Sequence, residues 1–164
     1  MEDFWTLVWE QDVHTILTLL PWQEKREVPG EGCWPLEGDS LCTKLLTIQC
    51  GTEKLLPGGR CIQLKMKHEK KAKERQVQQF LCSLWSSRRQ PDVQSLVDVL
   101  SAARRCHRKR ASPLLLHCSG AVSQLGLLIS LDCLLQQMKA ERAVDVYGVT
   151  LQLARSCCLM TPTL

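Results

Sequence analysis

An apolar stretch that runs into a cysteine and then into small residues limits what this chain folds into. Residues 114–116 are three leucines, and they lead directly into His117 and Cys118. Small and polar residues follow, and from Gly126 the apolar residues 127–131 predict a helix. A loop between a buried strand and a helix start directs backbone N–H groups and the positive end of the helix dipole at one point. A cysteine thiol there loses its proton more readily, so the pattern indicates an anion-binding loop that carries a nucleophile.

Helix-like and strand-like patterns alternate along the rest of the chain. The spacing of Phe4, Trp5, Val8 and Trp9 predicts a helix over residues 2–11. Asp92 is expected to cap a second helix that runs to about residue 107. The other expected elements are strands over 13–20, 43–50, 60–67, 75–82 and 113–117, a loop over 22–42, and helices over 126–140 and 144–156. This mixture, with a ligand loop at the carboxyl end of a strand, indicates an α/β fold.

The cysteine segment resembles the signature of the protein tyrosine phosphatases, which reads His-Cys, five residues, Arg, Ser or Thr, and Gly. The residues that match it are His117, Cys118, Ser119 and Gly126. Further stretches that are similar to family segments are 3–11, 13–16, 33–35, 77–80, 85, 144–147 and 159–163. Residues 141–147 look most like the second, membrane-distal domain of receptor-type members. The resemblance implies a twisted mixed sheet flanked by helices, in a partial domain over 1–164 that is truncated at both ends.

The resemblance also implies a role for each residue of the cysteine loop. Cys118 stands at the position of the nucleophile that attacks phosphorus. The surrounding phosphate-loop positions are His117, Ser119, Gly120, Ala121, Val122, Ser123, Leu125 and Gly126. Gln124 stands where the family has arginine, and Ser87 stands where it has the aspartic general acid. Leu125 replaces the hydroxyl residue, and Ala121 and Ser123 replace glycines, which is expected to strain the loop.

These departures remove groups that phosphate hydrolysis needs. Glutamine is neutral and offers one NH₂ group, whereas arginine offers a charged planar fork. A serine at position 87 is no useful general acid at neutral pH, and Asp92 is expected to be a helix cap rather than a displaced acid. Loss of a general acid costs roughly 10²–10⁴ in rate, and loss of one electrostatic stabiliser costs about 10²–10³. The sequence therefore predicts a domain that has lost most of its phosphatase activity.

Three functions remain open at this level. The first is a pseudophosphatase, which would act as a regulatory or docking module in the cytoplasmic part of a single-span receptor whose membrane span lies outside this chain. Its expected partner is a phosphotyrosine protein or an adjacent active phosphatase domain. The second is weak hydrolysis of protein tyrosine phosphate through a cysteinyl-phosphate intermediate. The third is a redox sensor in which Cys118 is reversibly oxidised.

Composition argues against several other classes. The ten cysteines are irregularly spaced and several lie in apolar runs, so a secreted disulfide scaffold is not expected. The chain has no Cys-x-x-Cys pair and its four histidines are scattered, so no metal site and no cofactor are expected. Basic clusters over 65–75 and 104–110 are expected to be solvated, with an acidic partner or a membrane surface as the alternative. They lack interleaved aromatic residues, so nucleic-acid binding is not expected.

Overall fold

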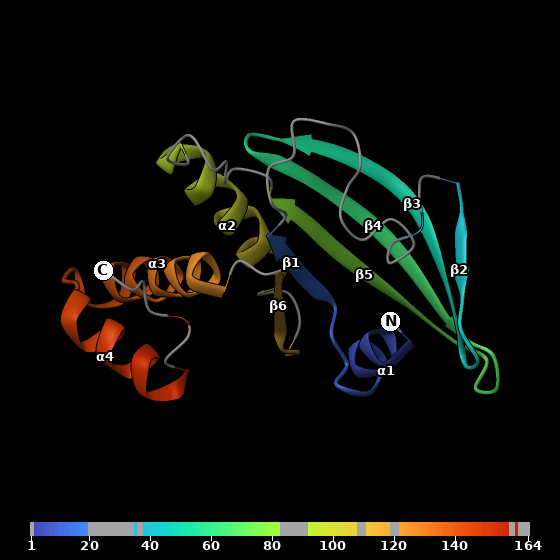
Figure 1. The fold of residues 1–164 in the computed structure, drawn as a ribbon. Helices are drawn as coiled ribbons and strands as arrows, with labels where there is room; N and C mark the ends of the chain where they lie inside the picture. Colours follow the sequence, from blue (N-terminus) through green and yellow to red (C-terminus); the bar gives the residue numbers. More distant parts are fainter. Residues whose placement is uncertain are drawn as a thin grey trace. The chain divides into compact units, whose positions relative to one another are not determined.

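The computed structural model describes residues 2–19, 35, 38–82, 92–107, 111–118, 122–157 and 160. Two compact units divide the chain, Met1–His117 and Cys118–Leu164. The elements of the first unit are α1 (Glu2–Glu10), β1 (Thr15–Leu19), β2 (Ser40–Cys42), β3 (Leu46–Leu56), β4 (Gly59–His68), β5 (Lys73–Cys82), α2 (Val93–His107) and most of β6 (Leu114–Cys118) (Figure 1). The second unit contains α3 (Val122–Glu141) and α4 (Val146–Ser156).

Within the described residues the strands form one six-stranded sheet in the order β2-β3-β4-β5-β1-β6. Strands β2 to β5 pair antiparallel, and β1 pairs parallel to β5, so the sheet is mixed as the sequence predicted. Figure 1 shows the long strands β3, β4 and β5 twisting around one another. The β3–β4 turn is tight because Pro57 suits its first central position and Gly58 adopts the positive φ of 77° at its second.

Helices of the first unit cover both faces of this sheet. Trp5 and Val8 of α1 are fully buried against Ile48, Leu64 and Val77 on one face. Side chains alternate along a strand, so the buried residues 17, 19 and 80 point to the opposite face, where α2 contacts β1 and β5. Strand β1 is consequently buried along its whole length, as expected for a strand covered on both sides.

The second unit consists of a long apolar helix and a shorter one packed against it. Leu125 and Leu128 of α3 are buried, and α3 contacts α4. The carboxylate of Asp145 accepts a hydrogen bond of 2.8 Å from the N–H of Gly148 and so caps the start of α4. A side-chain cap at this point directs the chain from α3 into the first turn of α4.

Most expected elements lie within a few residues of the observed ones. The prediction for Asp92 is confirmed, because its carboxylate accepts hydrogen bonds from the N–H and the hydroxyl of Ser95, and α2 starts at the next residue. Two boundaries are wrong. Strand β3 continues to Leu56 because the turn residues come only afterwards, and α3 begins at Val122 instead of residue 126. Strand β2 also lies at the end of the expected loop over 22–42, of which 22–34, 36 and 37 lie outside the described residues.

Candidate functional site

Cys118 ends strand β6, and helix α3 begins four residues further on, at Val122. The Cys118 side chain is half-buried, so its thiol is partly accessible. The first N–H groups of α3 have no partner within the helix, and they carry the positive end of its dipole. Ser119, Gly120 and Ala121 lie outside the described residues. The structure therefore has the order of strand, cysteine and helix start that the sequence predicted, with a longer helix.

The second half of the expected loop belongs to the first turn of α3. Val122, Ser123 and Leu125 are all helical, which corrects their assignment to a loop. Ser123 is exposed and is absent from the residues with positive φ, so the expected strain at this position is wrong. Leu125 is only 7% exposed, and it is buried together with Leu128, which lies one turn later. Burial of these two leucines extends the helix toward Cys118.

Gln124 lies in this first helical turn and is half-buried. Its side chain makes no hydrogen bond or ion pair with the described part of the chain. The amide NH₂ can donate to an anion but adds no positive charge. The sequence contains no lysine or arginine between Cys118 and Met138, and the basic residue of α3 is Lys139 in its last turn. This helix therefore offers an anion only its backbone dipole and neutral donors.

Gly126 is buried, and Met160 lies directly over its Cα. A Cβ atom at this position would collide with the backbone carbonyl of Met160. Backbone atoms cannot rotate away as a flexible side chain does, so only glycine fits without a shift of the helix or of the segment around Met160. The glycine that matches the phosphatase signature is thus required by packing within the second unit.

His117 precedes Cys118 on β6 and points to the opposite side of the strand. Its ring makes an edge contact with Phe4 of α1, with ring centroids 5.3 Å apart. Burial lowers the pKa of His117 below the ordinary value for histidine, because the charged form loses solvation. The imidazole is therefore neutral at neutral pH and belongs to the packing between α1 and the sheet.

The position expected for the general acid, Ser87, lies outside the described residues. Asp92 is the first carboxylate downstream of it, and its carboxylate is occupied at the start of α2. The side-chain hydrogen bond from Ser95 is the main cause that lowers the pKa of Asp92. A carboxyl with a lowered pKa is ionised at neutral pH, so Asp92 has no proton to give to a leaving group.

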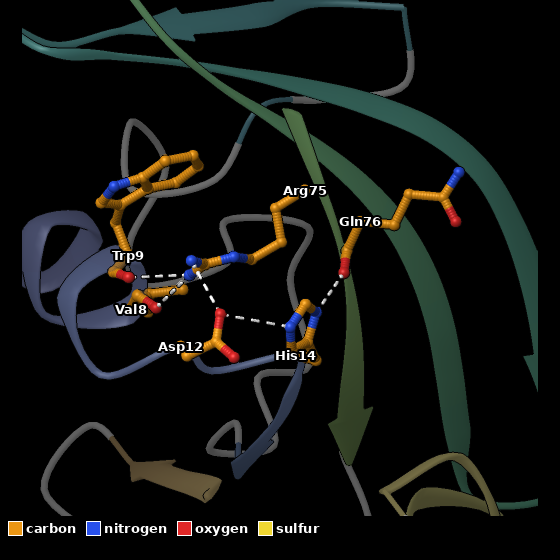
Figure 2. Close-up of polar contacts among 6 residues, drawn as sticks. All are labelled: Val8, Trp9, Asp12, His14, Arg75 and Gln76. Carbon is orange, nitrogen blue, oxygen red and sulfur yellow. Dashed lines mark hydrogen bonds and ion pairs between the residues drawn. The ribbon is translucent and has the colours of Figure 1, made fainter. Parts of the chain in front are cut away.

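Sequence reasoning missed a polar network around Arg75, which it had placed in a solvated basic cluster. The Arg75 side chain is only 15% exposed. Its Nη1 donates to the carbonyl oxygens of Val8 at 3.1 Å and Trp9 at 2.8 Å, and its Nη2 lies 2.8 Å from the Asp12 carboxylate (Figure 2). The Nε2 atom of His14 lies 3.4 Å from the same carboxylate oxygen. Arg75 thus binds the carboxyl end of α1, where the helix dipole favours a cation.

The eight cysteines in the described part of the chain form no disulfide bonds with one another. Burial is the main cause that raises the pKa of Cys61 to about 11. No group of three or more His, Cys, Asp or Glu residues within the described ranges is arranged to hold a metal ion. Cys118 is the thiol that ends a strand four residues before a helix begins.

A family model described as protein-tyrosine phosphatase matches residues 1–163. The chain belongs to the protein-tyrosine phosphatase family. The crystal structure of the catalytic domain of human protein tyrosine phosphatase non-receptor type 18 is similar, with a TM-score of 0.79 and 26% sequence identity. The match covers 93% of this chain and 56% of that one. The expected fold of a mixed sheet flanked by helices is thereby confirmed.

The curated relatives are receptor-type members of this family. Receptor-type tyrosine-protein phosphatase V of Rattus norvegicus is 35% identical over 99% of this chain and 10% of its own length. Receptor-type tyrosine-protein phosphatase F of Homo sapiens is 31% identical over 90% of this chain and 8% of its own length. This chain spans about a tenth of these receptors, and the predicted receptor-type resemblance is confirmed. None of the helices described in the structure is both long and apolar enough to cross a membrane.

Proposed function

We propose that this chain is a receptor-type tyrosine-phosphatase domain that binds or regulates rather than hydrolyses. The observation that carries the proposal is Gln124, a neutral residue in the helical turn after Cys118, at the position where the family has arginine. A doubly negative phosphate ester bound there lacks the bidentate cation that holds its oxygens. Ser87, at the general-acid position, removes the proton donor for the leaving group.

The expected loss of rate follows from these two departures. A missing general acid lowers the rate by roughly 10²–10⁴, and a missing electrostatic stabiliser lowers it by about 10²–10³. Such losses do not multiply fully when the groups act together. Even the larger single loss, on the order of 10⁴, leaves turnover too slow for a signalling phosphatase.

The relatives indicate the setting of this domain. As in a receptor-type phosphatase, the domain would lie on the cytoplasmic side and act as a docking or regulatory module. Its partner would be a phosphotyrosine protein or an adjacent active phosphatase domain. Cys118, Gln124 and the first turn of α3 would then contact a phosphate group without cleaving it.

Activity measurements with the Cys118→Ser variant test this proposal. Release of phosphate from a phosphotyrosine peptide is measured for the purified chain and for the variant, at equal concentration. We expect the two rates to be the same within error. A parent rate that exceeds the Cys118→Ser rate tenfold would refute the proposal.

A gain-of-charge variant tests the role assigned to Gln124. Gln124→Arg is expected to raise vanadate affinity about tenfold or more, since a full charge replaces a neutral donor. Gln152→Arg, on the exposed side of α4, is the matched control with the same added charge. Equal effects of the two variants would mean that residue 124 does not face the bound anion.

Weak residual hydrolysis is the second candidate, favoured by the half-buried Cys118 at the strand end before a helix start. In this case the thiolate attacks phosphorus, the tyrosine oxygen leaves with a proton from water, and water then releases phosphate from sulfur. It predicts that a cysteinyl-phosphate adduct at Cys118 is detected by mass spectrometry after acid quenching. Absence of the adduct, together with equal rates for Cys118→Ser, favours the docking function.

A further inference from the structure

A pocket of about 330 Å³ opens on the first unit, between α1, the start of β3 and the turn that joins β4 to β5. Its apolar wall is formed by Trp9, Leu45 and Leu46. Leu46 is buried, whereas Leu45 is 38% exposed, so the pocket reaches from the core to the surface. Ligand pockets in proteins range over about 300–1,000 Å³, and this one has the volume for a single large side chain or a small aromatic molecule.

The aromatic wall of the pocket is held rigidly. The guanidinium carbon of Arg75 lies 4.4 Å from the ring centroid of Trp9 (Figure 2). The ring of His68 packs against Trp9 from the sheet, with centroids 5.3 Å apart. Arg75 is itself fixed by the Asp12 carboxylate and the carbonyls at the end of α1. A preformed wall of this kind loses little conformational freedom when a ligand binds.

His68 supplies a hydrogen-bond donor at the pocket. His68 is 6% exposed, and its Nδ1 atom accepts a hydrogen bond of 3.1 Å from the backbone N–H of Lys70. An imidazole nitrogen that accepts has no proton, so in the neutral ring the proton lies on Nε2. This Nε2–H has no hydrogen-bond partner within the described residues. An imidazole N–H at the wall of a pocket can donate a hydrogen bond to an acceptor of the ligand.

The rim of the pocket has an excess of positive charge. Two lysines, Lys70 and Lys71, line the pocket together with one carboxylate, Glu10. Lys73 pairs with His68 across the hairpin, so its side chain lies on the same face of the sheet.

The two other carboxylates of the hairpin, Glu69 and Glu74, have partners away from the pocket lysines. Glu69 accepts a hydrogen bond of 2.6 Å from the hydroxyl of Thr47, and Glu74 lies 2.8 Å from the ammonium group of Lys65. Glu69 keeps its negative charge, but neither carboxylate forms an ion pair with Lys70 or Lys71 within the described residues. A ligand that complements this rim is negatively charged.

We propose that this pocket binds an acidic peptide segment that carries one large aromatic side chain. The aromatic side chain packs on Trp9 and Leu45, and a peptide carbonyl or carboxylate accepts the Nε2–H of His68. Acidic residues on either side meet Lys70 and Lys71. A peptide fits better than a small molecule because the volume matches one side chain while the charge continues along the turn to Lys73. The inference does not depend on whether Cys118 is catalytically active.

Fluorescence anisotropy with labelled peptides tests the ligand class. The probe is a peptide with a central phenylalanine and three acidic residues on each side, and the control peptide has alanine at the centre. The purified full chain is expected to bind the phenylalanine peptide at least about tenfold more tightly, because the control peptide lacks the apolar side chain that the pocket would bury. Equal binding of both peptides would show that the apolar pocket is not used and would overturn the proposal.

Matched charge variants test the location. Lys70→Gln with Lys71→Gln is expected to weaken binding about fivefold or more at low salt and less at high salt. Lys65→Gln with Lys67→Gln removes the same charge from the opposite face of the same hairpin and is expected to have little effect. If both pairs weaken binding equally, the peptide is held by general attraction and the proposed site is wrong.

A variant of His68 tests the donor. His68→Asn retains an acceptor for the N–H of Lys70 but removes the distal donor, so binding is expected to weaken about two- to tenfold. Thermal unfolding of each variant identifies loss of folding. If His68→Asn unfolds, the comparison of the two lysine pairs still tests the proposed site. Binding of anionic phospholipid vesicles without binding of the peptide would assign the pocket to a membrane surface and refute the peptide proposal.

Discussion

Gly126 and Gln124 lie two positions apart in α3, but the fold restricts the side chain at position 126 far more than at position 124. The carbonyl of Met160 occupies the space that a Cβ of residue 126 would need. Gln124 is half-buried and has no hydrogen bond to the described part of the chain. Packing therefore requires a glycine at position 126. The role of Gln124 depends instead on its contact with a bound anion.

Replacement of Gly126 by alanine is expected to destabilise the chain by about 1–3 kcal/mol through steric overlap with Met160. Helix propensity alone favours alanine by about 0.8–1 kcal/mol, so the two effects have opposite signs. Urea unfolding measures the change in free energy. Ser123→Ala, at an exposed site of the same turn, is the control. An increase in stability for Gly126→Ala would contradict the packing described here.

Cys61 is expected to react slowly with iodoacetamide, because burial raises its thiol pKa to about 11 from the ordinary 9.0. This change lowers the thiolate fraction near pH 8 about a hundredfold and raises the intrinsic nucleophilicity about tenfold, so the net rate falls about tenfold. Peptide mass spectrometry compares Cys61 with Cys42, which is exposed. Labelling of Cys61 at the same rate as Cys42 would mean that its thiol is not shielded.

Helix α1 shows how an element depends on distant residues. It has nine residues, which is shorter than the roughly 12–15 that a helix needs to be even marginally stable alone. Burial of Trp5 and Val8 holds its apolar face to the sheet. Arg75 of β5 binds its carboxyl end through two carbonyl groups. The end of α1 is thus stabilised by a residue more than sixty positions away.

Arg75→Lys keeps the charge but removes the planar fork that reaches two carbonyls and the Asp12 carboxylate at once. Because these acceptors are left partly unsatisfied, the free energy of unfolding is expected to fall by about 2–3 kcal/mol. Lys67→Arg, an exposed change on the adjacent strand, is expected to stay within about 0.5 kcal/mol. Similar stability of Arg75→Lys and the parent chain would show that the network contributes little.

At the scale of the whole molecule, titration links the fold to pH. Burial lowers the pKa of His117, so the native chain keeps this imidazole neutral where the unfolded chain binds a proton. The unfolded state therefore binds more protons below about pH 6.5, and stability falls as pH decreases through this range. Asp92 acts in the same direction below about pH 4, since its pKa is also lowered in the native state.

The His117→Asn variant separates the first of these two effects. Between pH 7.5 and 5.5 the parent chain is expected to lose more stability than the variant, because asparagine does not titrate. Urea midpoints at both pH values measure the difference. If parent and variant lose the same stability over this interval, His117 is protonated equally in the folded and unfolded states.

The sequence alone determined the local features of this protein. Asp92 was recognisable as a cap because its side chain bonds to residues three positions away. The strand that ends at Cys118 and the apolar helix after it follow from short-range patterns. The family signature, with Gln124 in place of arginine, was likewise readable from one short segment.

Only the tertiary structure decided features that join distant segments. The sequence pattern assigned Arg75 to a solvated cluster because its partners, at the end of α1, are far away in the sequence. Helix α3 begins earlier than its pattern indicates, since burial of Leu125 outweighs the polar character of Ser123 and Gln124. The pocket at His68 is formed by three separate segments, and no local pattern contains them all. Short-range interactions can be predicted from neighbouring residues, whereas burial and long-range pairing exist only after the chain has folded.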